Sequence, residues 1–155
     1  MPFSVKREGG CLHTKERRHA EIFSDGASSG NPGHAGIGVV INLYDGTPAC
    51  RLSEYIGIAT NNVAEYTAFI TALEKARSLG IKRVKVFLDS ELVVKQINGL
   101  YKVKNLNLMP LWMRAKKLLA DFDSFTVSHV MREMNKEADA LATKAVKQRR
   151  AGGVT

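Results

Sequence analysis

The stretch Glu21-Ile-Phe-Ser-Asp-Gly-Ala-Ser-Ser-Gly-Asn-Pro-Gly33 determines how the fold begins. Its first residues, up to Asp25, are typical of a short β-strand that stops at Gly26, and a turn-rich segment follows. Residues 35–43 form a second apolar run, and Asp45-Gly46 predicts a hairpin after it, because this pair readily adopts positive φ. With a third run at residues 50–58, the chain is predicted to open as an antiparallel meander of three strands.

The residues after Asn61 have a different period, in which apolar side chains recur at spacings of three and four. This spacing is typical of one face of an α-helix. The residues that carry it are Val63, Tyr66, Phe69, Ile70, Leu73, Ala76 and Leu79, and Gly80 supplies the stop. Further along, the sequence predicts a strand at residues 84–88, helices at 91–97 and 110–120, a strand at 125–130, and a last helix with Asn135 as its N-cap.

Strands and helices therefore alternate in the second half of the chain. Strand–helix–strand crossovers require parallel pairing there, whereas the hairpins make the first half antiparallel. The sequence predicts an α/β fold, in which one mixed sheet has helices packed on its faces. Residues 21–148 are expected to form this single domain, after a flexible arm at residues 1–20 and before a frayed basic tail at residues 149–155.

The composition is that of a basic chain, in which 23 Lys and Arg against 15 Asp and Glu give a formal net charge of +8. Such an excess favours polyanionic partners, although many basic proteins merely carry a solvated surface. No apolar run is long enough to span a bilayer, and the N-terminus lacks the apolar segment of a signal peptide. With two cysteines and no zinc-ligand spacing, we expect a reducing, cytoplasmic setting.

Four acidic residues fall where the predicted elements would bring them together. Asp25 and Asp89 end two strands that are expected to be parallel neighbours, Glu65 lies in the first turns of the long helix, and Asp139 lies beside the apolar stripe of the last helix. Each alone has an ordinary explanation: a turn former for Asp25, the helix dipole for Glu65, an N-cap for Asp89 and a solvated helix face for Asp139. Jointly they are candidates for metal-dependent phosphodiester cleavage, which needs several carboxylates at one point.

Four motifs of this chain resemble those of type 1 ribonucleases H, and they occur in that family's order. Residues 25–33 resemble the family's DGxxxGNPG opening, and residues 60–65 resemble its TNNxxE helix start. Asp89-Ser90 matches the DS that ends a strand, and residues 135–142 match the final NxxxDxLA helix. The resemblance covers about residues 21–146.

This resemblance implies a ribonuclease H-like fold, a five-stranded mixed sheet whose second strand is antiparallel to the others. It implies an endonuclease that hydrolyses the RNA strand of RNA–DNA hybrids by a two-metal-ion mechanism and leaves 5′-phosphate and 3′-hydroxyl ends. The cofactor would be two Mg²⁺ ions, with Mn²⁺ as a substitute, and the protein would be a monomer. The catalytic and metal-binding residues would be Asp25, Glu65, Asp89 and Asp139. The substrate-binding residues would be Gly26, Ala27, Ser28, Asn31, Thr60, Asn61 and Asn62.

The sequence departs from many family members in two places. Only residues 100–109 connect Gly99 to Pro110, so the basic, Trp-containing protrusion of many members is absent or reduced. The candidates to replace it are Lys102, Lys104, Lys116 and Lys117. Residues 130–134 are too few for the family's mobile His-bearing loop; His129 is interpreted as a structural strand residue, and Arg132 or Glu133 are candidates for the loop's place. This compact form resembles the enzymes of some archaea and bacteria.

Three other interpretations follow from the same residues. Some compact ribonucleases H also attack double-stranded RNA, so that substrate is an alternative. A non-catalytic nucleic-acid-binding module on the same fold is a second, but such a module is expected to lose carboxylates, and all four are present. Residues 26–30 also match the G-x-S-x-G pattern of serine hydrolases, but an apolar strand-like run follows them instead of a helix, which argues against a nucleophile elbow.

Overall fold

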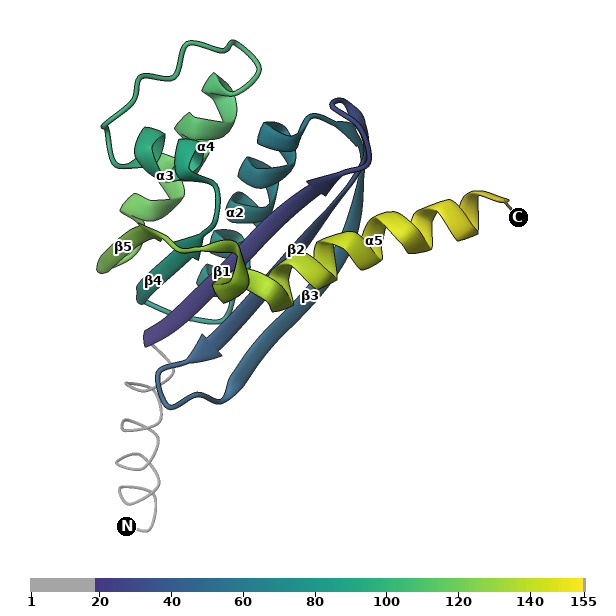
Figure 1. Ribbon diagram of the computed structural model, residues 1–155. Coiled ribbons are helices and arrows are strands. Elements are labelled where there is room, and N and C mark those ends of the chain that lie inside the picture. Colours follow the sequence, from purple (N-terminus) through teal and green to yellow (C-terminus); the bar gives the residue numbers. More distant parts are fainter. Residues whose placement is uncertain (1–18, 155) are drawn as a thin grey trace.

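A computed structural model describes residues 19–154 of the chain, with side chains up to residue 149. The described residues form one five-stranded sheet with helices on both faces (Figure 1). In chain order the elements are β1 (His19–Ser28), β2 (Gly33–Leu43), β3 (Pro48–Ala59), α2 (Asn61–Ser78), β4 (Arg83–Leu88), α3 (Glu91–Ile97), α4 (Met109–Ala120), β5 (Ser124–His129), the 3₁₀ helix η1 (Arg132–Asn135) and α5 (Lys136–Val154).

The sheet is mixed, and its strand order is β3-β2-β1-β4-β5. β2 is antiparallel to β1 and β3, whereas β1 is parallel to β4 and β4 is parallel to β5. β2 therefore runs against the other four strands, which confirms the predicted fold. The parallel pairing of β1 with β4 brings their C-terminal ends to one edge of the sheet.

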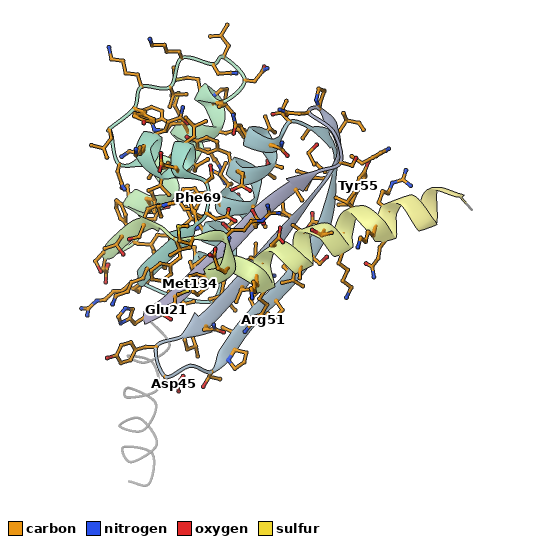
Figure 2. All side chains as sticks on the ribbon, viewed as in Figure 1. Glu21, Asp45, Arg51, Tyr55, Phe69 and Met134 are labelled. Atoms are coloured by element: carbon orange, nitrogen blue, oxygen red, sulfur yellow. The ribbon has the colours of Figure 1, made fainter. Side chains whose placement is uncertain are left out.

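The larger core lies between the sheet and α2, α3 and α4, with α2 in the central position (Figure 1). The apolar stripe of α2 places Tyr66, Phe69 and Leu73 in this layer, where all three are fully buried. They belong to the same apolar cluster as Ile22 of β1 and Val39 of β2, and Figure 2 labels Phe69 within it. Burial of this stripe holds α2 against β1, and this fixes the position of the first turns of the helix.

α5 crosses the opposite face of the sheet (Figure 1) and approaches β2 closely because glycines face it. A Cβ atom on Gly38 would overlap the carbonyl oxygen of Ala138, and one on Gly36 would lie 2.6 Å from the carbonyl oxygen of Ala142. Ser53 of β3 adds a hydrogen bond of 2.6 Å from its hydroxyl to the carbonyl oxygen of Leu141. This close contact brings the N-terminal turns of α5 next to β1.

Several boundaries differ from those predicted. β1 continues through Gly26 to Ser28 because residues 26–28 keep their antiparallel pairing with β2. Asn135 directly precedes α5, at the position predicted for the N-cap, but among the described residues its side-chain oxygen accepts no hydrogen bond. The residue is 1% exposed, and its Nδ2 donates a hydrogen bond of 3.0 Å to the carbonyl oxygen of Ser24. Asn135 thus ties the turn before α5 to β1. α5 itself is described as far as Val154 and includes most of the segment that was expected to fray.

The predicted arm at residues 1–20 lies almost wholly outside the described residues. Among residues 19–154, none of the helices has both the length and the apolar character that crossing a membrane requires. Cys50 is a free thiol on β3.

Candidate active site

Asp25 and Asp89 lie next to each other because of the register between β1 and β4. Phe23 pairs with Phe87 in this parallel ladder, and their rings stack with centroids 5.1 Å apart. Asp25 follows Phe23 by two residues within β1, and Asp89 follows Phe87 by two residues, directly after β4. Residues two apart in extended chain point to the same face, and one oxygen of each carboxylate lies within 4.8 Å of the other. The two carboxylates therefore meet at the edge of the sheet, as the sequence predicted.

Glu65 reaches the same edge from the first turns of α2. Thr60 begins this helix, since its side-chain hydroxyl accepts a hydrogen bond of 3.2 Å from the backbone N–H of Val63. The backbone N–H of Gly26 donates a hydrogen bond of 2.7 Å to Glu65 Oε1. A Cβ atom on Gly26 would overlap the backbone of Ala64, so a glycine is needed where α2 meets β1.

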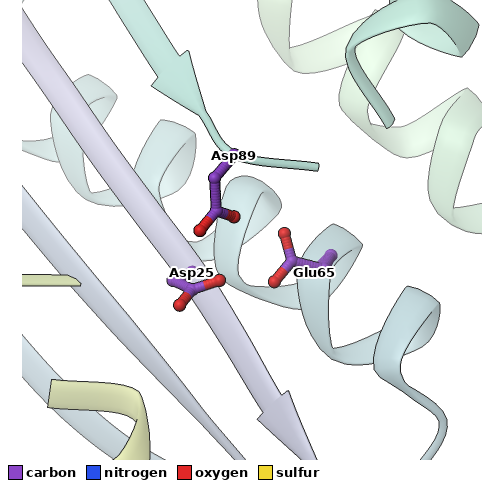
Figure 3. Close-up of side chains that lie close together, drawn as sticks. All are labelled: Asp25, Glu65 and Asp89. Atoms are coloured by element: carbon purple, nitrogen blue, oxygen red, sulfur yellow. The ribbon is translucent and has the colours of Figure 1, made fainter. Parts of the chain in front are cut away.

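Three of the four predicted carboxylates form one close cluster. One oxygen atom each from Asp25, Glu65 and Asp89 lie within 4.8 Å of one another (Figure 3). Asp139 lines the same cavity of about 480 Å³ but does not come within that distance of all three. One oxygen of Asp139 lies 3.8 Å from the guanidinium group of Arg132. The structure thus brings all four carboxylates to the lining of one cavity, where Asp139 also interacts with Asp25.

Burial changes the ionisation of this cluster. Asp25 is 5% exposed, and desolvation is the main cause of its raised pKa, followed by a hydrogen bond and the like charge of Glu65. Desolvation also raises the pKa of Glu65, although hydrogen bonds from Asp25 and from the backbone of Gly26 oppose it. Without a cation, the Asp25–Glu65 pair is therefore stabilised by retaining a proton.

The donor atoms of this cluster suit a hard divalent cation. Mg²⁺ and Mn²⁺ prefer carboxylate oxygens, and all three close side chains supply them. Crowded, desolvated carboxylates are costly unless a proton or a cation compensates their charge. Within the described part of the chain, no other group of three or more His, Cys, Asp or Glu side chains is as close. The residues present therefore fit a bound Mg²⁺ or Mn²⁺.

The predicted substrate-binding residues separate into two sets. Gly26, Ala27, Ser28, Asn61 and Asn62 line the carboxylate cavity. Asn31 and Thr60 do not line it. The Asn31 side chain accepts a hydrogen bond of 3.1 Å from the backbone N–H of Asn61, and Thr60 caps α2. Both therefore shape the start of α2.

Two further residues line the cavity although the sequence did not single them out as site residues. Ser90 follows Asp89 in the same motif and begins α3, so its proximity could have been predicted. Arg132 was only one candidate for the position of the missing loop, and its place beside Asp139 depends on the 3₁₀ turn η1. His129 is an exposed residue at the end of β5, and it does not line the cavity.

Comparison with known proteins agrees with this fold. Residues 23–145 match the family model described as Reverse transcriptase-like. A curated relative, the Ribonuclease HI of Halobacterium salinarum, is 43% identical over 130 residues, which are 84% of this chain. The chain spans 64% of the length of that relative. Relatives from Mycobacterium are 42% identical to this chain, which spans 35% of their length.

Solved structures give the same result. The crystal structure of RNase H1 from Halobacterium salinarum superposes with a TM-score of 0.82 at 41% identity, and the match covers 84% of this chain and 98% of that one. LC11-RNase H1, which was crystallised in complex with RNA/DNA hybrid, superposes with a TM-score of 0.80 at 39% identity, covering 84% of this chain and 98% of that one. On these matches, the chain belongs to the ribonuclease H family.

Proposed function

We propose that this protein is an endoribonuclease that hydrolyses the RNA strand of RNA–DNA hybrids. The observation that carries the proposal is the convergence of Asp25, Glu65 and Asp89 within 4.8 Å, with Asp139 on the same cavity. The proposal is supported by the similar LC11-RNase H1, whose crystal structure contains such a hybrid. The excess of basic residues is consistent with a polyanionic substrate.

The four carboxylates would hold two divalent cations, Mg²⁺ or, as a substitute, Mn²⁺. Such ions supply a water activated for attack on the scissile phosphate and neutralise the departing 3′ oxygen, so the products carry 5′-phosphate and 3′-hydroxyl ends. Asp25 and Glu65 would exchange their retained proton for the cations, because the desolvation that raises their pKa also strengthens attraction to a positive charge. Gly26 keeps Glu65 in place through its backbone N–H.

The substrate contacts follow from the cavity lining. The backbone of Gly26, Ala27 and Ser28 and the side chains of Asn61 and Asn62 line it and would contact the strand held there. Contacts to 2′-hydroxyl groups would distinguish RNA from DNA without reading base sequence. Asn31 and Thr60 would act by fixing the start of α2. We infer a monomer that acts in the cytoplasm, where Cys50 stays reduced.

The test is cleavage of labelled substrates by the full chain in Mg²⁺, with the Asp25→Asn variant as the control. Wild-type protein should cut the RNA strand of a hybrid, and the variant should not. If the protein clearly prefers double-stranded RNA over hybrid, double-stranded RNA replaces hybrid as the assigned substrate. Hybrid binding without cleavage by the wild type would instead favour a non-catalytic module.

A further inference from the structure

A second cavity adjoins the one that holds the carboxylates. Its volume is about 300 Å³, and it shares four lining residues with the first, namely Ala27, Ser28, Arg132 and Asp139. The remaining lining residues come from the turn after β1 and from α5, and they are Ser29, Thr143, Val146 and Lys147. Because the lining is shared, the two cavities form one groove that leads from the carboxylates along α5.

α5 sets the direction and the length of this groove. Asp139, Thr143 and Lys147 are four residues apart, so they lie on one face of the helix at intervals of about 6 Å. The row from Asp139 to Lys147 therefore spans about 12 Å. Since a strand of a duplex advances about 3.4 Å per nucleotide, this row can lie along about three to four nucleotides.

The chemistry of the groove suits a phosphodiester backbone. Arg132 and Lys147 supply positive charge, Ser29 and Thr143 supply hydroxyls, and Asp139 is the one acidic residue in the lining, at the end shared with the active site. Lys147 is exposed, and among the residues whose side chains are described its ammonium group has no hydrogen-bond or ion-pair partner. Cations next to hydroxyls match alternating phosphates and ribose hydroxyls.

We propose that this groove binds the backbone of the scissile RNA strand on one side of the cut, with Lys147 contacting a phosphate. The inference rests on the proposed function, because the strand has to be held at the carboxylates before its flank can enter the groove. The position of Lys147 is fixed by the packing of α5, whose preceding residues Ala142 and Ala145 lie against Gly36. The groove thus extends the substrate footprint beyond the catalytic cavity.

The first test compares Lys147→Ala with Lys144→Ala. Lys144 is a matched control, since it is an exposed lysine on the same helix but does not line the groove. Binding of a labelled hybrid is measured in the full chain with the Asp25→Asn background, so that the result does not depend on cleavage. Lys147→Ala should weaken binding severalfold. It should also make the negative slope of log affinity against log salt shallower by about 0.9, as expected for one lost phosphate contact. Lys144→Ala should change the slope much less.

The second test uses hybrids that are trimmed to about two base pairs on one side or the other of a single cleavage position. Trimming the side that occupies the groove should weaken binding to the Asp25→Asn protein and have little further effect on the protein that also carries Lys147→Ala. Trimming the other side should affect both proteins equally.

The proposal that the groove binds the RNA strand would be overturned by either of two results. One is an equal effect of Lys147→Ala and Lys144→Ala on hybrid binding, and the other is an equal loss of affinity on trimming in both proteins. These outcomes are separate from failure of the proposed function. If wild-type protein does not cut hybrid but the Lys147 effect on binding remains, the groove stands and the catalytic proposal fails.

Discussion

The backbone N–H of Gly26 donates a 2.7 Å hydrogen bond to the carboxylate of Glu65, and this contact joins the strand that carries Asp25 to the helix that carries Glu65. The contact exists because residue 26 has no side chain, since a Cβ atom there would overlap the backbone of Ala64. Formation of the carboxylate cluster therefore depends on a residue that has no functional group of its own.

Replacing Gly26 by alanine is expected to lower both stability and activity. The added methyl group must push α2 away from β1, which typically costs about 1–3 kcal/mol in unfolding free energy, and it would displace Glu65 from Asp25. Urea denaturation and hybrid cleavage measure the two effects. Gly46→Ala is the control, because Gly46 has a φ of 89° and open space around it. That variant should lose some stability but keep its specific activity, and equal activity losses in both variants would contradict the role of Gly26.

Neutralising Asp89 or Glu65 is expected to remove activity without unfolding the protein. Asp89→Asn and Glu65→Gln each delete one charged ligand from the cluster, and we expect hybrid cleavage in Mg²⁺ to fall by at least about a hundredfold. Without metal, loss of like-charge repulsion should leave the unfolding temperature unchanged or raise it. Near-full cleavage by either folded variant would argue strongly against the metal site.

The metal-free protein is expected to lose stability as pH rises from about 4. Desolvation raises the pKa of Asp25 and Glu65 in the folded state, whereas in the unfolded chain they titrate at about 3.9 and 4.3. Above those values the folded state keeps protons that the unfolded state has released. The unfolding free energy therefore falls with pH, by at most about 1.4 kcal/mol per pH unit for each proton, until the raised pKa values are reached.

Thermal unfolding in a chelator between about pH 4 and about pH 8 measures this slope, and Asp25→Asn should make it shallower. Added Mg²⁺ should raise the unfolding temperature more at about pH 8 than at about pH 5, because the cation competes with the retained proton. A flat profile in the chelator would show that the pair is not protonated in the folded state.

Arg132 is expected to contribute to turnover from the position where other family members have a His-bearing loop. Its side chain is 79% exposed and its guanidinium group lies 3.8 Å from Asp139. Arg132→Ala should lower the rate of hybrid cleavage by about tenfold or more, with little change in unfolding temperature. Arg77→Ala is the control, since Arg77 forms a similar exposed ion pair, with Asp121. Unchanged turnover in Arg132→Ala would contradict this role and leave Glu133 as the other candidate for the loop's place.

The convergence of Asp25, Glu65 and Asp89 could be predicted from the sequence, because it follows from the order and the ends of the strands and helices. Asp25 lies near the end of β1 and Asp89 directly follows β4. These strands were expected to be parallel neighbours, and they are, so the proximity of the two residues could be predicted without side-chain packing. The period of α2 placed Tyr66, Phe69 and Leu73 in the core, and Glu65 then had to lie near the same edge.

Other features depend on packing between segments far apart in the chain, which a pattern of residues does not show. The close approach of α5, which carries Asp139, requires Gly36 and Gly38 to face Ala142 and Ala138. Asparagine is a common N-cap residue, but Asn135 lies in η1 and is turned toward β1. Its buried side-chain amide therefore donates a hydrogen bond to the carbonyl oxygen of Ser24. The periodicity of a segment and the residue at which it ends can be found along the chain, whereas these contacts join segments that are far apart in it.

The metal site is tested by anomalous diffraction from crystals of the Asp25→Asn variant and of the wild type, each grown with Mn²⁺ and a hybrid whose RNA strand is chemically blocked against cleavage. We expect two manganese peaks in the wild-type cavity bounded by Asp25, Glu65, Asp89 and Asp139, and the loss of at least one peak in the variant. Manganese peaks elsewhere and none in this cavity would contradict it.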